Sequence, residues 1–96
     1  VLDNTTALSD ATGVEVSVYP NPNSGLFNLR FRTEDMQHIS IRIRNTIGET
    51  ILSEEQIPVD GEIIRTFNLD AYAEGIYFLV IDNGKYTSTE KIILQK

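Results

Sequence analysis

The feature that most constrains the fold is an alternation of apolar and polar residues with a period of two. Three runs show it without a break: Val14 to Val18, Phe27 to Phe31 and Ile39 to Ile43. Successive side chains of a β-strand point to opposite faces, so each run predicts a strand with one buried face. No stretch has the three-to-four-residue spacing of a long amphipathic helix. The chain is therefore predicted to be all-β.

Four more segments complete a predicted set of about seven strands. They are Thr50 to Gln56, Ile63 to Leu69, Ile76 to Ile81 and Tyr86 to Gln95. Asp60-Gly61 and Asp82-Asn83-Gly84 are predicted as hairpin turns, the second of type I′. Asp70 to Glu74 is predicted as one helical turn that ends at Gly75. The segment from Ile76 to Ile81 is apolar on both faces, which is typical of a central strand covered on both sides.

Strands this short, joined by hairpin-sized links, predict two packed antiparallel sheets. We expect one immunoglobulin-like β-sandwich over residues 14–96, although the Cys–Trp–Cys core of antibody domains is missing. Residues 1–13 are small and polar without a sustained period, and we expect a flexible lead-in or linker there. The chain begins at Val1 without a basic-then-apolar leader, so it is expected to be a piece of a longer protein.

The charge balance is acidic, with 8 basic against 14 acidic side chains and a formal net charge of −6. Binding to nucleic acid requires a broad basic face, so no nucleic-acid partner is expected. An anionic membrane surface is disfavoured for the same reason. No apolar run reaches the length of a membrane-spanning helix, so no direct membrane insertion is expected.

The residue inventory argues against catalysis and against a bound cofactor or metal. The chain has no Cys and one His, His38, which we expect to be a solvated turn residue. The acidic pairs Glu34-Asp35 and Glu54-Glu55 are adjacent in sequence, so on a strand they would point to opposite faces. The loop Asp82-Asn83-Gly84 supplies two oxygen-bearing side chains, whereas a Ca²⁺ site wants about six to eight ligands.

Four arginines form the one basic feature that suggests a partner. Arg30 and Arg32 share one face of a predicted strand, and Arg42 and Arg44 share one face of the next. If these strands pair as a hairpin across residues 33–38, a basic patch forms that could dock on an acidic surface. The alternative is a solvated sheet face where Asp and Glu of neighbouring strands pair with the arginines.

Two local motifs predict defined corners of the sandwich. In Tyr19-Pro20-Asn21-Pro22, each proline holds the residue before it out of the helical region. Gly25 can take a positive φ without steric cost, so the segment is expected to be a stiff turn. Tyr77 comes after Gly75, at an inter-strand crossing. This is the place of the corner tyrosine in Greek-key sandwiches, whose hydroxyl forms a hydrogen bond with the upstream backbone.

Three stretches together resemble the C-terminal sorting domain of the type IX (Por) secretion system. They are Val18 to Pro22 with Gly25 to Leu29 (the family's "YPNP…G.F.L" opening), Ile41 to Gly48, and Leu69 to Ile81 followed by Lys91 to Lys96. The resemblance covers residues 14–96, and Asn45 stands where the family often has Asp. It implies recognition or structural roles for ten residues: Tyr19, Pro20, Asn21, Pro22, Gly25, Gly48, Gly75, Tyr77, Lys91 and Lys96.

The resemblance implies a non-catalytic signal that directs an N-terminal passenger domain out of the cell. Its implied partners are the outer-membrane translocon, the shuttle proteins of the system, and a sortase-like peptidase. The passenger would pass through the periplasm and be released or attached to the cell surface. The peptidase would cut in or before residues 1–13. The terminal strand, if it lies at a sheet edge, could also offer its backbone to a partner by strand addition.

An alternative is an accessory sandwich of a secreted enzyme, either a structural spacer or a carbohydrate-binding module. Sugar binders use a flat platform of exposed aromatic rings. This chain has no Trp, and its four Tyr and four Phe lie mostly at positions predicted to face inward. The composition therefore argues against a carbohydrate-binding module, whereas the sorting signal is what the resemblance implies and the structural spacer stays an alternative.

Overall fold

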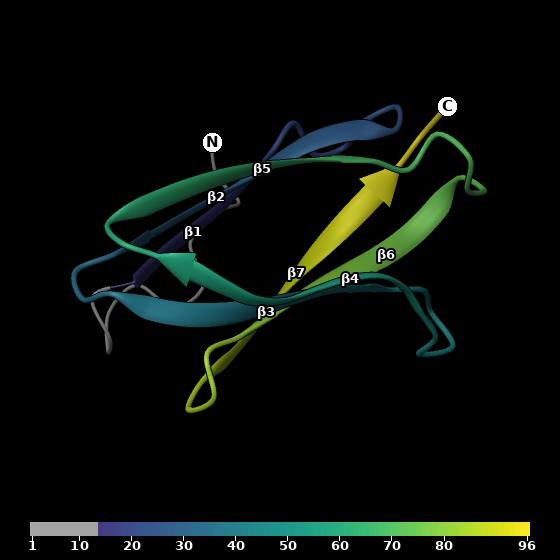
Figure 1. Cartoon of the computed structure of the whole chain (residues 1–96). Helices are drawn as coiled ribbons and strands as arrows, with labels where there is room; N and C mark the ends of the chain where they lie inside the picture. Colours follow the sequence, from purple (N-terminus) through teal and green to yellow (C-terminus); the bar gives the residue numbers. More distant parts are fainter. Residues whose placement is uncertain (1–13) are drawn as a thin grey trace.

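The computed structural model describes residues 14–96, and these form seven strands. In chain order they are β1 (Val14–Tyr19), β2 (Leu26–Thr33), β3 (Gln37–Arg44), β4 (Thr50–Val59), β5 (Glu62–Asn68), β6 (Gly75–Asp82) and β7 (Thr87–Leu94). They make two antiparallel sheets, β1-β2-β5 and β4-β3-β6-β7, that pack face to face (Figure 1). The predicted seven-stranded sandwich is confirmed, and it is consistent with an immunoglobulin-like fold.

The core lies between the sheets and is built from the alternating apolar residues. Leu29 of β2, Ile43 of β3 and Leu79 of β6 are completely buried. The rings of Phe27 and Phe67 stack across β2 and β5 with their centroids 5.6 Å apart. Because every second side chain of these strands points inward, one continuous hydrophobic cluster joins the two sheets.

A salt bridge spans the two sheets where their edge strands β4 and β5 meet. A bulge in β4, where Gln56 has a φ of 55°, places Glu54 opposite the buried Ile41. Arg65 of β5 lies in register with the buried Leu29, and its guanidinium is 3.3 Å from the Glu54 carboxylate. The arginine that interrupts the inward face of β5 is thus explained by a partner in the other sheet.

Two predicted hairpins have different outcomes. Asp60-Gly61 joins β4 to β5, which belong to different sheets, so it is a link between sheets and the predicted hairpin is wrong. Asp82-Asn83-Gly84 does join the paired strands β6 and β7. In that loop only Gly84 has a positive φ, so the turn is not of type I′, which needs two such residues.

Two other local predictions need correction. Residues 70–74 form a turn with a hydrogen bond from Tyr72 N to Leu69 O at 2.9 Å, and no helical turn is present there. A segment this short cannot repay the cost of helix nucleation. Strand β6 is central in its sheet, but its outward side chains Ile76, Phe78 and Val80 are exposed or half-buried, so it is covered on one face alone.

Candidate functional site

The motif residues from distant parts of the chain converge on one end of the sandwich. We call this region the motif end, and it comprises residues 20–25, 45–49, 69–75 and 91–96. Strand pairing brings them together, because Arg44 lies beside Phe78 and Gly75 lies beside Leu94. In Figure 1 the C-terminus and the start of β6 lie at the same end of the molecule.

The segment between β1 and β2 covers the outer edge of β7. The side chain of Asn21 donates to the carbonyl oxygen of Lys91 at 2.7 Å and accepts the N–H of Ile93 at 2.9 Å. The backbone of Asn23 then continues the pairing: its N–H donates to Ile93 O at 3.0 Å, and its carbonyl accepts Gln95 N–H at 2.8 Å. The edge of β7 from Lys91 to Gln95 is therefore already occupied.

This arrangement bears on the idea that β7 binds a partner by strand addition. Strand β7 is an edge strand, as that idea requires. The backbone groups that a new strand would need at Lys91, Ile93 and Gln95 are already bonded to the chain itself. A protein protects an edge in this way against pairing with other chains.

Gly25 links the same segment to the loop that precedes β6. Its N–H donates to the side chain of the buried Asn23 at 2.9 Å, and its carbonyl accepts Leu69 N–H at 2.7 Å. The φ of Gly25 is 137°, and a Cβ at this position would lie 2.5 Å from Asp70 Oδ1. The backbone conformation therefore requires glycine here, and a Cβ would also force the side chain of Asp70 to move.

Side-chain hydrogen bonds connect the loop 69–75 to three other parts of the chain, namely β6, β4 and Lys96. The hydroxyl of Tyr77 donates to the carbonyl oxygen of Ala73 at 2.5 Å, which is the upstream contact expected of a corner tyrosine. The hydroxyl of Tyr72 donates to Ile51 O at 3.4 Å. The ammonium group of Lys96 donates to the carbonyl oxygens of Asp70 and Tyr72, each at 2.6 Å. Lys96 is thus hydrogen-bonded to the loop 69–75.

Gly48 lies in the tight turn between β3 and β4. The Asn45 side chain accepts the N–H groups of Ile47 and Glu49 at 3.1 and 2.9 Å, and Gly48 N–H donates to Asn45 O at 3.1 Å. The φ of Gly48 is 88°. Asn45 organises this turn through its acceptor oxygen, and its amide nitrogen also donates to the Glu49 carboxylate at 2.8 Å, a bond that an aspartate in its place would lose.

The four arginines do not form a single patch. Strands β2 and β3 belong to different sheets, so Arg30 and Arg32 lie on one outer face of the sandwich and Arg42 and Arg44 on the other. The hairpin across residues 33–38, on which a single patch depended, is absent because those residues cross between the sheets.

Three of the arginines pair with glutamates of neighbouring strands. Arg30 pairs with Glu62, Arg32 with Glu15 at 3.4 Å, and Arg42 with Glu55 at 3.2 Å. The contact with Glu62 raises the pKa of Arg30. For these three arginines the structure agrees with the alternative expectation, a solvated sheet face on which acidic residues of neighbouring strands pair with the arginines. Arg44 forms no salt bridge with another described residue, and its Nε is buried without a hydrogen-bond partner there.

Within residues 14–96 no group of three or more His, Cys, Asp or Glu side chains is placed to hold a metal ion. His38 is exposed at the start of β3. The same residues include no helix with the length and hydropathy needed to cross a membrane. The predicted lead-in, residues 1–13, lies outside the described residues.

The structure also shows contributions that the sequence pattern did not reveal. Asn23 makes one backbone contact to Ile93 of β7 and one to Gln95 just after it, and it positions Gly25 through its side chain. The Glu74 side chain accepts the backbone N–H of Lys96 at 3.0 Å. The role of Asn23 could have been suspected from its place in a turn beside Pro22, because the side chain of a turn asparagine commonly forms hydrogen bonds with nearby backbone.

A known family covers most of the chain. The model of the secretion system C-terminal sorting domain matches residues 17–95, most of the chain. The chain belongs to the C-terminal sorting domains of the type IX secretion system. No curated protein matches it. As a member of this family the chain is a sorting signal for export, which leads to secretion or attachment at the cell surface. The family implies interaction with the type IX machinery in general, and a sorting-signal domain is not a catalytic one.

Proposed function

We propose that this domain directs an N-terminal passenger through the outer-membrane translocon, with the help of the shuttle proteins, and is then removed by a sortase-like peptidase. The observation that carries the proposal is the convergence of the family motifs on the motif end. There the opening motif bonds to the backbone of Lys91 and Ile93, and Lys96 bonds to the loop before β6. A signal built from distant segments has one shape whatever passenger precedes it.

We propose further that the domain itself is not an enzyme. Among the described residues the one imidazole, that of His38, is exposed, and no acidic cluster accompanies it. A nucleophile, a tuned acid or base and a pocket are the minimum for catalysis, and this part of the chain does not bring them together.

The exact roles of the motif residues belong to the same proposal. Asn21, Gly25 and Tyr77 would shape the signal, because their contacts are internal. Tyr19, Pro20 and Pro22 are exposed and would be read by the machinery. Gly48 and Gly75 would fix the turns that frame the end of the sheet.

The experiment is a fusion of residues 1–96 to a fluorescent reporter that carries an export signal, in a host with this secretion system. We expect reporter in the medium or on the cell surface, with a new C-terminus in or before residues 1–13 by mass spectrometry. A matched fusion of residues 14–96 should be exported, and it should remain uncut if the cut lies within residues 1–13. Export of the first fusion without any cut would contradict the role of the peptidase.

A further inference from the structure

The outer face of the four-stranded sheet is divided into two unlike halves. The half over β4 and β3 is polar, and Glu55 binds both Ser40 and Arg42 there. The half over β6 and β7 carries outward apolar side chains, among them Phe78 and Val80. The outer face of the other sheet is polar along β2, where Arg30 and Arg32 are paired and Asn28 binds Thr66.

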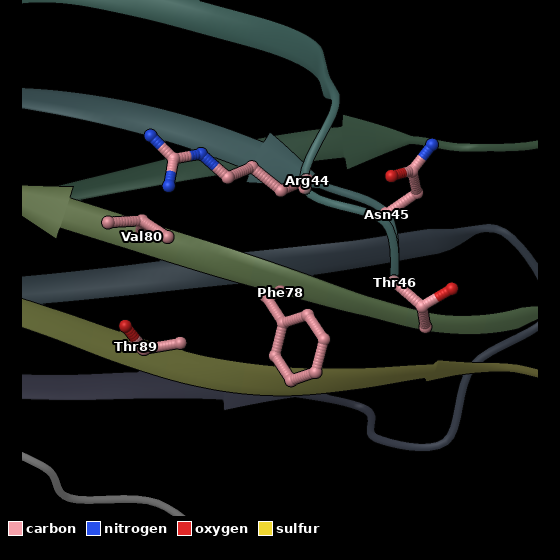
Figure 2. A pocket seen from close by; sticks show the side chains of 7 residues that line it. Arg44, Asn45, Thr46, Phe78, Val80 and Thr89 are labelled. Atoms are coloured by element: carbon pink, nitrogen blue, oxygen red, sulfur yellow. The ribbon is translucent and has the colours of Figure 1, made fainter.

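A shallow groove of about 310 Å³ lies on the apolar half. Phe78 and Val80 line it, Arg44 and Thr89 flank it, and the turn after β3 closes one end of it (Figure 2). Figure 2 shows Arg44 extended along β3 beside Val80, with its guanidinium directed away from the turn.

Strand register places a cation on each side of the aromatic ring. Arg44 of β3 pairs with Phe78 of β6, and Phe78 pairs with Lys91 of β7. Neither Arg44 nor Lys91 forms a salt bridge with another described residue. The nearest acid on the outward side of β6 is Asp82, at the far end of the strand, where it accepts Gly84 N–H at 2.7 Å. In the turn after β3, the Glu49 carboxylate accepts a hydrogen bond from the side chain of Asn45 at 2.8 Å. The row Arg44–Phe78–Lys91 thus carries two cations without a carboxylate partner among the described residues, on a chain of net charge −6.

We infer that this row and groove form a docking surface for a protein segment that presents a carboxylate beside an apolar side chain. The apolar side chain packs on Phe78 and Val80, and the carboxylate lies within reach of Arg44 or Lys91. Charge complementarity argues for this partner, because an acidic group would neutralise two cations that have no salt-bridge partner among residues 14–96. A planar guanidinium suits a carboxylate in particular. The inference rests on the proposed function for one point, that the segment belongs to the export machinery.

The surface is tested directly by titrating the labelled 1–96 domain with a probe peptide, acetyl-Leu-Glu-Leu-Glu-Leu-amide, by NMR. We expect shifts confined to the amides of Phe78, Val80 and Thr89 and to the side chain of Arg44. The double variant R44Q/K91Q should bind about tenfold more weakly, for loss of charge-assisted contacts worth about 1.4 kcal/mol in all. A peptide with Lys in place of Glu should give no shifts.

Three titration results would overturn the inference. They are shifts spread over both outer faces, equal binding by the two peptides, or concentration-dependent shifts of the same amides without peptide. The last would show that a second copy of this chain occupies the face.

The reporter fusion tests the link to export. The variants F78T and R44Q/K91Q should lower export at least about fivefold, while I64T and R32Q, on the outer face of the other sheet, should leave it unchanged. Circular dichroism verifies that each variant is folded. If the unchanged fusion is not exported, the proposed function fails and the titration still decides the surface. If all variants are exported equally, the surface inference fails and the proposed function stands.

Discussion

The side-chain oxygen of Asn21 accepts the backbone N–H of Ile93 at 2.9 Å, a contact between the second residue after β1 and the last full strand of the domain. The same side chain donates to Lys91 O. One asparagine therefore supplies the donor and the acceptor that a neighbouring strand would supply, and it protects the edge of β7. This relationship explains physically why the opening motif and the terminal strand occur together in one signal.

Replacement of Asn21 by alanine removes both contacts. Two hydrogen bonds at about 0.5–1.5 kcal/mol each predict a loss of about 1–3 kcal/mol in the free energy of unfolding, measured in urea. The Ile93 amide should also exchange its hydrogen faster. The matched control Asn28→Ala loses one exposed bond with Thr66 and should cost less than about 1 kcal/mol. Equal losses in the two variants would contradict the protective role of Asn21.

Replacement of Gly25 by alanine should destabilise the fold by about 2–3 kcal/mol, because the new Cβ meets Asp70 and the backbone conformation is strained. Gly84→Ala is the matched control: its φ is also positive, at 93°, but open space surrounds it. We expect Gly84→Ala to lower the free energy of unfolding by about 1 kcal/mol. The change Asp70→Ala made together with Gly25→Ala should recover part of the loss. No recovery would show that the steric contact is unimportant.

Glu90 makes stability depend on pH. Its carboxyl lies on the same side of β7 as the buried Ser88 and Ile92, and burial raises its pKa to about 7 from an ordinary 4.5. The folded state thus favours the neutral acid. Its contribution to stability is complete below pH 4.5 and is lost as the pH rises through 7. Since the side chain is half exposed, we expect a loss of about 1–2 kcal/mol between pH 4.5 and 8.

The check on Glu90 is the free energy of unfolding at pH 5 and pH 8 in the unchanged domain and in Glu90→Gln. The variant should lack this pH dependence and should be the more stable protein at pH 8. If both proteins lose the same amount of stability over this range, another group is responsible.

The alternation of apolar residues was enough to predict β1, β2 and β3 and their core residues, because the two-residue period is a local property of the backbone. It missed the end of β4, where the buried Ile57 and Val59 follow a bulge. Phe31 and Ile43 face the core as that pattern requires. Which strands pair with each other, in contrast, depends on contacts between distant parts of the chain. The pattern could not decide whether β2 pairs with β3 or crosses to the other sheet, and so it wrongly joined Arg30 and Arg42 in one patch.

The motif end was predicted only in its parts. The turn at Gly48 and the corner contact of Tyr77 follow from local chemistry. The binding of Asn21 to β7 and of Lys96 to the loop 69–75 depends on how the whole chain closes, and no spacing in the sequence encodes that. For the same reason the cation–aromatic row Arg44–Phe78–Lys91 emerged only from the strand register.

The most direct test of the central claim, that this domain is a type IX sorting signal, is the fraction of a periplasm-targeted reporter that leaves the cell when residues 1–96 follow it. The comparison is the same fusion in a strain that lacks the outer-membrane translocon. We predict that most of the reporter is found outside cells with the system and that all of it stays in the periplasm without it. An equal distribution in the two strains would contradict the account.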